Sequence, residues 1–144
     1  MTVIGKKIDG VEYSERKASY AILKNIEGRL ATVEIKNWGL IFLGGKIEDG
    51  EDKEETIKRE ALEEVGYRID SLKFYETFEV YYELMNKGEK IFCHAIVDFY
   101  TGEIGNKIQD PTEKNHEIKW FYPQELFGKM KLDFQNFVLE KIYF

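Results

Sequence analysis

The segment from Gly44 to Tyr67 places the strongest constraint on the fold of this chain. It opens with two glycines, continues as an acidic loop and then carries the signals of one short helix. Asp52 is a suitable N-cap, with Glu55 following as in a capping box, and Gly66 suits the left-handed residue just past a helix end. We therefore expect a glycine turn, a loop and a capped helix in this segment.

Three glutamates gather on one side of the expected helix. Glu60, Glu63 and Glu64 stand at positions i, i+3 and i+4, which share one side of a helix. The apolar residues point elsewhere, toward a core: Ile57, Ala61, Leu62 and Val65. Clustered carboxylates raise one another's pKa unless a cation is present, and hard divalent ions prefer oxygen ligands. The pattern favours a Mg²⁺ or Mn²⁺ site over its alternative, a solvated acidic helix face.

The combined pattern resembles the signature of the Nudix hydrolase family, Gly-x5-Glu-x7-Arg-Glu-aliphatic-x-Glu-Glu-x-Gly-aliphatic. Every fixed position of that signature is met here, by Gly45, Glu51, Arg59, Glu60, Glu63, Glu64 and Gly66. Ala61 and Tyr67 depart from the pattern, since larger aliphatic residues are usual at their positions. Leu43 stands where many members have proline before the glycines, which leaves the turn less stiff.

The resemblance implies a role for each charged residue of the helix. Glu60, Glu63 and Glu64, together with the Gly45 carbonyl, would bind Mg²⁺ or Mn²⁺. Arg59 would orient these carboxylates through charge-assisted hydrogen bonds.

The general base is left open by the resemblance, because Nudix enzymes do not all take it from the same place. Glu60 or Glu63 could serve, and so could a glutamate from the second half of the chain, Glu113 or Glu117. We favour Glu113 of these last two, because it falls in the more mobile segment. Glu51 is expected to be either structural or a further metal ligand.

The reaction implied by the resemblance is metal-dependent hydrolysis of a nucleoside diphosphate linked to another group. For a MutT-type enzyme this means a nucleoside triphosphate, including oxidised or non-standard ones, cleaved to monophosphate and pyrophosphate. One alternative is an ADP-ribose or dinucleoside polyphosphate hydrolase. A second alternative, of another class, is a nucleotide-sensing module that keeps the fold without turnover.

Three residues outside the helix are candidate substrate contacts. Arg16 precedes the apolar run Lys17–Leu23, and the corresponding strand of the family lies beside the substrate. Trp38 has the size to shelter the site or stack on a base. His94 shares one face of a long strand with Asp98, where the two would line a pocket.

Composition limits the partners of the chain. Its formal charge of -6 and the lack of a basic run disfavour a nucleic-acid binder but allow a small nucleotide bound through metal. Cys93 is the only cysteine, so no disulfide can form within the chain. The sequence also shows no signal peptide and no membrane span, from which we expect a cytoplasmic protein. A homodimer is left open.

The remaining patterns predict an α/β fold, in which a mixed β-sheet is sandwiched between helices as in the Nudix α/β/α sandwich. With 144 residues, the chain is expected to form one domain spanning residues 1–144. A terminal helix is expected around Phe134, Phe137 and Val138, a long loop at Thr101–Asn115, and a helix turn after Pro123. The expected strands are a brief edge strand at Val3 and Ile4, then Lys17–Leu23, Leu30–Ile35, Lys73–Leu84, Lys90–Tyr100 and His116–Tyr122.

Overall fold

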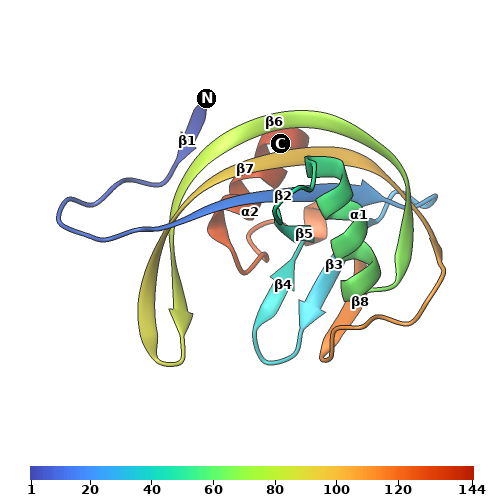
Figure 1. Cartoon of the computed structure of the whole chain (residues 1–144). Helices are drawn as coiled ribbons and strands as arrows, with labels where there is room; N and C mark the ends of the chain where they lie inside the picture. The colour runs from blue at the N-terminus through green and yellow to red at the C-terminus, as the bar shows by residue number, and fades with distance from the viewer.

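The computed structural model describes residues 1–144 and is built on one curved mixed sheet (Figure 1). Two pairs of neighbouring strands, β1 with β6 and β2 with β7, run parallel, and the other pairs are antiparallel. The order across the sheet is β1-β6-β7-β2-β3-β4, with β5 beside β2 and β8 beside β3. The strands are β1 Thr2–Ile4, β2 Ser14–Lys24, β3 Leu30–Ile35, β4 Gly39–Ile41, β5 Leu43–Lys46, β6 Tyr67–Asn86, β7 Glu89–Lys107 and β8 His116–Phe121.

The strand β2 joins the two parts of the sheet. On one side it pairs with β7 along its whole length, and on the other it pairs with β5 between Ala18 and Ala21. Gly45 lies opposite Ser19 in that second pairing. The glycine pair of the signature is therefore held against the middle of the sheet rather than in a free loop.

Helix α1 (Lys53–Glu64) begins and ends where the sequence predicts. The side chain of Asp52 accepts a hydrogen bond of 2.8 Å from the backbone N–H of Glu55. Gly66 has φ 78°, and a Cβ there would lie 1.9 Å from the carbonyl oxygen of Gln109. Glycine is thus required at this helix end both by its dihedral angle and by the close approach of a second segment.

Helix α2 (Asp133–Tyr143) lies on the opposite side of the sheet from α1 (Figure 1). The ring of Phe134 packs against Tyr20, Tyr82 and Phe99 of the sheet, with centroids 5.1–6.3 Å apart. A sheet between two helices is the α/β/α arrangement expected from the sequence. Neither helix has the length and apolarity needed to cross a membrane.

The second half of the chain differs from the expectation in two places. Strand β7 continues to Lys107, so the loop expected from Thr101 begins only after that residue. Gly102 and Gly105 lie inside the strand: a Cβ on either would come within 2.4 Å of an oxygen on β6. These glycines permit close strand approach, whereas the polar, glycine-containing sequence of Thr101–Asn115 suggested a loop. The segment after Pro123 is a single 3₁₀ turn, η1 (Pro123–Glu125).

Candidate active site

Arg59 is the centre of an ion-pair network on the outward side of α1. One of its terminal nitrogens, Nη1, lies 2.9 Å from the Glu60 carboxylate and 3.1 Å from the Glu63 carboxylate. The other, Nη2, donates to Glu51 at 3.1 Å and to the Lys46 carbonyl at 3.2 Å, and Nε also donates to Glu51. All three guanidinium nitrogens are therefore engaged within the protein, as an orienting role for Arg59 requires.

Glu51 anchors this network to the loop before the helix. Besides Arg59, its carboxylate accepts hydrogen bonds from the Glu48 backbone N–H and the Thr56 hydroxyl. These donors, Arg59 first, lower the pKa of Glu51 to about 2. Of the two roles expected for Glu51, the structural one fits these contacts, because the carboxylate is already surrounded by donors.

Glu60 and Glu64 lie against the two glycines. A Cβ on Gly45 would come within 2.9–3.2 Å of the Glu60 carboxylate, so a side chain there would push this carboxylate away from its present position. Glu64 is only 4% exposed and accepts a hydrogen bond of 3.3 Å from the Gly44 backbone N–H. Burial, with the charge of Glu60 second, raises the pKa of Glu64 well above its usual value.

Glu113 reaches the same cluster from a distant part of the chain. The backbone N–H groups of Thr112 and Glu113 both donate to the carbonyl oxygen of Glu63, at 3.0 and 2.9 Å. The charge of Glu113 contributes to the raised pKa of Glu60, after burial, and to that of Glu64. Glu117 lies elsewhere, on β8, where it pairs with Lys119 at 3.3 Å. Of the two second-half candidates, the structure brings Glu113 to the helix carboxylates.

The donor set suits a hard divalent cation. Burial, and then the neighbouring carboxylates, raise the pKa values of Glu60 and Glu64, and Arg59 pairs with Glu60 and Glu63 but not with Glu64. The missing side chain of Gly45 lets the Glu60 carboxylate come close to the backbone of β5. In this conformation Glu60 and Glu63 turn to Arg59, and no three acidic, His or Cys side chains are close enough together to hold one ion. The ligands are thus adjacent but not assembled around a single point.

The three predicted substrate contacts lie in different places. Arg16 donates from Nη2 to the Tyr20 hydroxyl at 3.3 Å, and the charges of Glu64 and Glu60 act on that same tyrosine. Trp38 is half-buried at the β3–β4 hairpin, 5.7 Å below the Lys131 ammonium. Arg16 is thus linked to the carboxylate cluster through Tyr20, whereas Trp38 has no recorded contact with it.

His94 is on the sheet face opposite to Arg16. Its Nε2 lies 2.8 Å from Glu79, its Nδ1 contacts Glu15, and its ring stacks on Tyr81 at 4.6 Å. The two carboxylates, Glu79 first, raise the pKa of His94. Asp98 shares this face, as expected, but binds Lys53 at 3.1 Å and Thr77 rather than His94.

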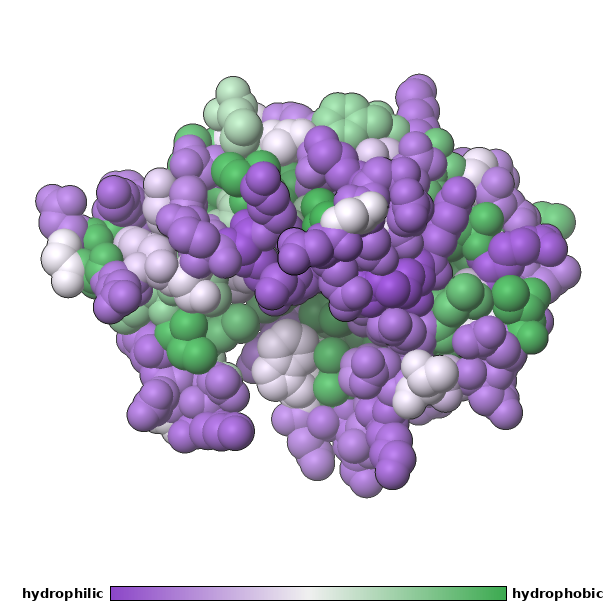
Figure 2. Space-filling view, viewed as in Figure 1, coloured by the Kyte–Doolittle hydropathy of each residue, from purple (hydrophilic) through white to green (hydrophobic).

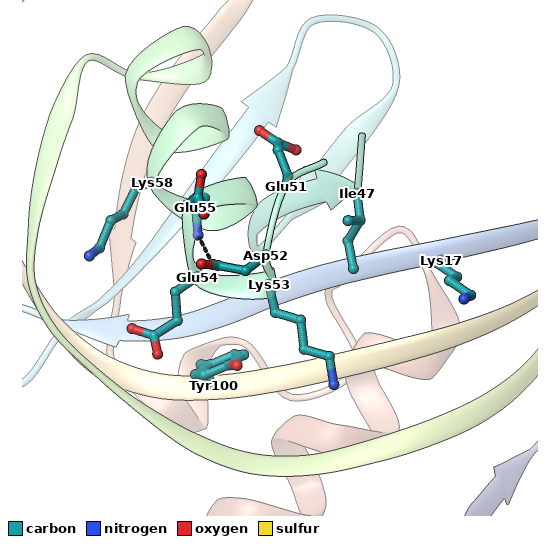
Figure 3. A pocket seen from close by; sticks show the side chains of 9 residues that line it. All are labelled: Lys17, Ile47, Glu51, Asp52, Lys53, Glu54, Glu55, Lys58 and Tyr100. Atoms are coloured by element: carbon teal, nitrogen blue, oxygen red, sulfur yellow. Dashed lines mark hydrogen bonds between the residues drawn. The ribbon is translucent and has the colours of Figure 1, made fainter. Parts of the chain in front are cut away.

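A cavity of about 600 Å³ lies between the first turn of α1 and the sheet (Figure 3). In this view Lys53 and Glu54 extend from the helix toward the strand that carries Tyr100. Basic and acidic side chains are mixed in its lining, so its charge selects neither anions nor cations. The lining residues are Lys17, Ile47, Glu51, Asp52, Lys53, Glu54, Glu55, Lys58 and Tyr100. None of the three clustered helix glutamates reaches it.

A mixed sheet between two helices, with carboxylates gathered on one helix against a glycine turn, defines a protein of the α/β/α sandwich class with an acidic site. The match to the model of the NUDIX domain over residues 15–141 then shows that the chain belongs to the Nudix family. Membership indicates a pyrophosphohydrolase. A comparison with curated proteins gives no match.

Solved structures with the same fold come from several bacteria and an archaeon. The chain is similar to a MutT structure from a comparison of the Aliivibrio salmonicida and Vibrio cholerae proteins (15% identity, TM-score 0.66, 90% of this chain and 97% of that one). It is similar to MutT from Methanosarcina mazei Go1 (19% identity, TM-score 0.66, 92% of this chain and 95% of that one). It is also similar to a MutT Nudix hydrolase from Burkholderia pseudomallei (20% identity, TM-score 0.66, 90% of this chain and 98% of that one). At these identities the likeness establishes the fold alone.

Proposed function

We propose that residues 1–144 form one catalytic domain that hydrolyses a nucleoside triphosphate to the monophosphate and pyrophosphate. The observation that carries this proposal is the convergence of Glu60, Glu63, Glu64 and Glu113 on one helix end beside Gly45. Solved MutT structures share the fold across nearly their whole length, which supports a substrate of the MutT type. The preference for oxidised or non-standard bases is part of the same proposal.

Mg²⁺ or Mn²⁺ is the cofactor that this site fits. Glu60, Glu63 and Glu64, with the Gly45 carbonyl, would hold it, and Arg59 would release two of these carboxylates to do so. When bound, the metal neutralises phosphate oxygens and lowers the pKa of a bound water. Near the carboxylates, Arg59 is fully engaged while Arg16 is not, so we assign Arg16 to a phosphate oxygen of the substrate.

Glu113 is the proposed general base. It takes a proton from the attacking water, whose oxygen bonds to phosphorus as the bridging P–O bond breaks. Glu113 lies on a loop whose backbone is hydrogen-bonded to α1, so its carboxylate can move while its backbone stays in place. Figure 2 shows that hydrophilic side chains cover the face of the molecule over α1. Trp38 and His94 remain predicted substrate contacts.

The test is a substrate panel with Mg²⁺ or Mn²⁺, with products separated by anion-exchange chromatography. We expect nucleoside triphosphates, ordinary or oxidised, to yield monophosphate and pyrophosphate at the highest kcat/KM. Faster cleavage of ADP-ribose or a dinucleoside polyphosphate would replace the substrate assignment while keeping the reaction. Metal-dependent nucleotide binding without any product would favour a sensing module instead.

A further inference from the structure

Tyr20 is a buried tyrosine whose hydroxyl lies beside charged groups. The residue is 4% exposed, and its ring lies among those of Phe99 and Phe134, with centroids 5.8 and 6.1 Å away. A tyrosine among such rings could serve packing alone, in which case a phenylalanine would do as well. The surroundings of its hydroxyl therefore decide whether it has a further role.

One side of that hydroxyl is taken by Arg16. The Nη2–H of Arg16 donates to the Tyr20 oxygen at 3.3 Å, and this is the only hydrogen bond that the guanidinium makes within the protein. The Nε of Arg16 is buried and has no acceptor. A buried, charged donor without a partner is costly, so its acceptor is expected to come from water or from a ligand.

The other side of Tyr20 leads to the carboxylates. Gly44 has φ 140°, and a Cβ on it would lie 2.8 Å from the Tyr20 ring, so the missing side chain lets the ring pack against the turn. The N–H of the same glycine donates to the buried Glu64 carboxylate. Arg16, Tyr20, Gly44 and Glu64 thus form one continuous chain of contacts from β2 to the end of α1.

From these contacts we infer that Tyr20 is a positioning residue, which holds Arg16 so that the part of its guanidinium without an acceptor in the protein binds a phosphate oxygen of the substrate beside Glu60 and Glu64. The inference rests on the proposed function for the presence of a phosphate there. It commits to phosphate rather than to the base, because the contacts of Tyr20 lead to the carboxylate end of the site. Arg16 makes the ligand contact, and Tyr20 acts only through Arg16.

A double-mutant cycle of Tyr20→Phe and Arg16→Ala tests this role. Alone, Tyr20→Phe is expected to lower kcat/KM by about tenfold, mostly through KM, because a hydrogen bond to a charged group is lost. With Arg16→Ala already present, Tyr20→Phe should change kcat/KM by less than about twofold. Additive losses would overturn the inference and leave the proposed function intact.

The matched control is Tyr100→Phe, which removes a hydroxyl from another buried tyrosine of the sheet. The pKa of Tyr100 is raised by burial first and by the charge of Glu54 second, and Arg16 makes no contribution. The Tyr100→Phe change should leave KM unchanged and remain additive with Arg16→Ala. Thermal unfolding of each variant checks the fold. If Tyr20→Phe does not fold, Arg16→Lys should raise KM similarly, because lysine keeps the positive charge but lacks the planar set of donors of a guanidinium.

The same cycle is read by calorimetry with an α,β-methylene nucleoside triphosphate and Mg²⁺, which needs no turnover. Non-additive loss of affinity supports the inference even in a protein that does not hydrolyse the substrate. A wild-type protein that neither binds the analogue nor hydrolyses any panel member would overturn both proposals together.

Discussion

The backbone N–H of Glu113 donates a hydrogen bond to the carbonyl oxygen of Glu63 at 2.9 Å. This contact ties the loop after β7 to the last turn of α1, where carbonyl groups have no partner within the helix. It also places the backbone of Glu113 next to Glu60 and Glu64, whose pKa values the charge of Glu113 helps to raise, after burial. The residue proposed as the general base is therefore held in place by backbone hydrogen bonds, although it lies on a loop.

Replacing Glu113 with Gln should lower kcat by about 10²–10⁴-fold, the usual contribution of a general base. Its backbone hydrogen bond to Glu63 does not involve the side chain, so the thermal unfolding temperature should stay unchanged. Steady-state kinetics across a pH series measure the effect. In a plot of kcat against pH, the rise that reflects deprotonation of the general base should disappear. Glu117→Gln is the matched control and should behave as wild type; the opposite order of effects would transfer the base to Glu117.

Replacing Glu63 with Gln should reduce turnover by at least about 100-fold, because one metal ligand and one Arg59 partner are lost. Initial rates at saturating Mg²⁺ give the result, with circular dichroism as a check on the helix. Glu54→Gln, on the first turn of the same helix, should retain activity. Equal activity of both variants would reject the metal assignment of Glu63.

Glu64→Gln should make the metal-free protein more stable. The buried carboxylate has a raised folded-state pKa, so its contribution favours folding at acidic pH and is lost as the pH rises above the unfolded value toward the folded one. The gain at neutral pH is of the order of 1 kcal/mol, or about 4 °C in thermal unfolding. Mg²⁺ should stabilise the wild type and not this variant; a lower unfolding temperature would contradict the prediction.

Glu51 should govern part of the acid stability. Its pKa is lowered to about 2, so the Arg59 contact stabilises the fold above the unfolded value near 4.5 and loses this effect as the pH falls toward 2. Glu51→Gln should flatten the pH dependence of urea unfolding between these limits. Glu48→Gln, whose carboxylate is 3.7 Å from Arg59 and 64% exposed, should leave the dependence unchanged.

Local sequence signals predicted α1 with its two caps and the grouping of its glutamates on one side, since these depend on neighbours in the chain, such as the Asp52 side chain bonded to the Glu55 N–H. The α/β/α fold was predicted from the order of the elements together with the family resemblance. The link between Arg16 and Tyr20 had no such signal, because Tyr20 sits in an apolar run that reads as core. The path of Glu113 to Glu63 depends on contacts between residues about 50 positions apart, which periodicity does not report. Gly102 and Gly105 led to the wrong prediction of a loop for a related reason, because their close approach to β6 is a tertiary contact that the local sequence does not report.

Gly66 is a position where a single substitution should strongly disturb the fold of the site. Gly66→Ala places a Cβ 1.9 Å from the Gln109 carbonyl oxygen, in addition to the strain of φ 78°. The strain alone costs about 1 kcal/mol, and the clash adds to it because backbone cannot swing aside as a flexible side chain does. The segment from Gln109 to Glu113 should move away from α1, with loss of activity as well as stability.

Gly50→Ala separates the two causes. Gly50 has φ 82°, nearly the same dihedral angle, but nothing lies within 4 Å of an added Cβ. Chemical denaturation should therefore show a loss of about 1 kcal/mol for Gly50→Ala and clearly more for Gly66→Ala. If the two losses are equal, the close approach of Gly66 to Gln109 contributes nothing to stability, and the Glu113 loop is anchored only by its backbone hydrogen bonds to the Gly66 and Glu63 carbonyl oxygens.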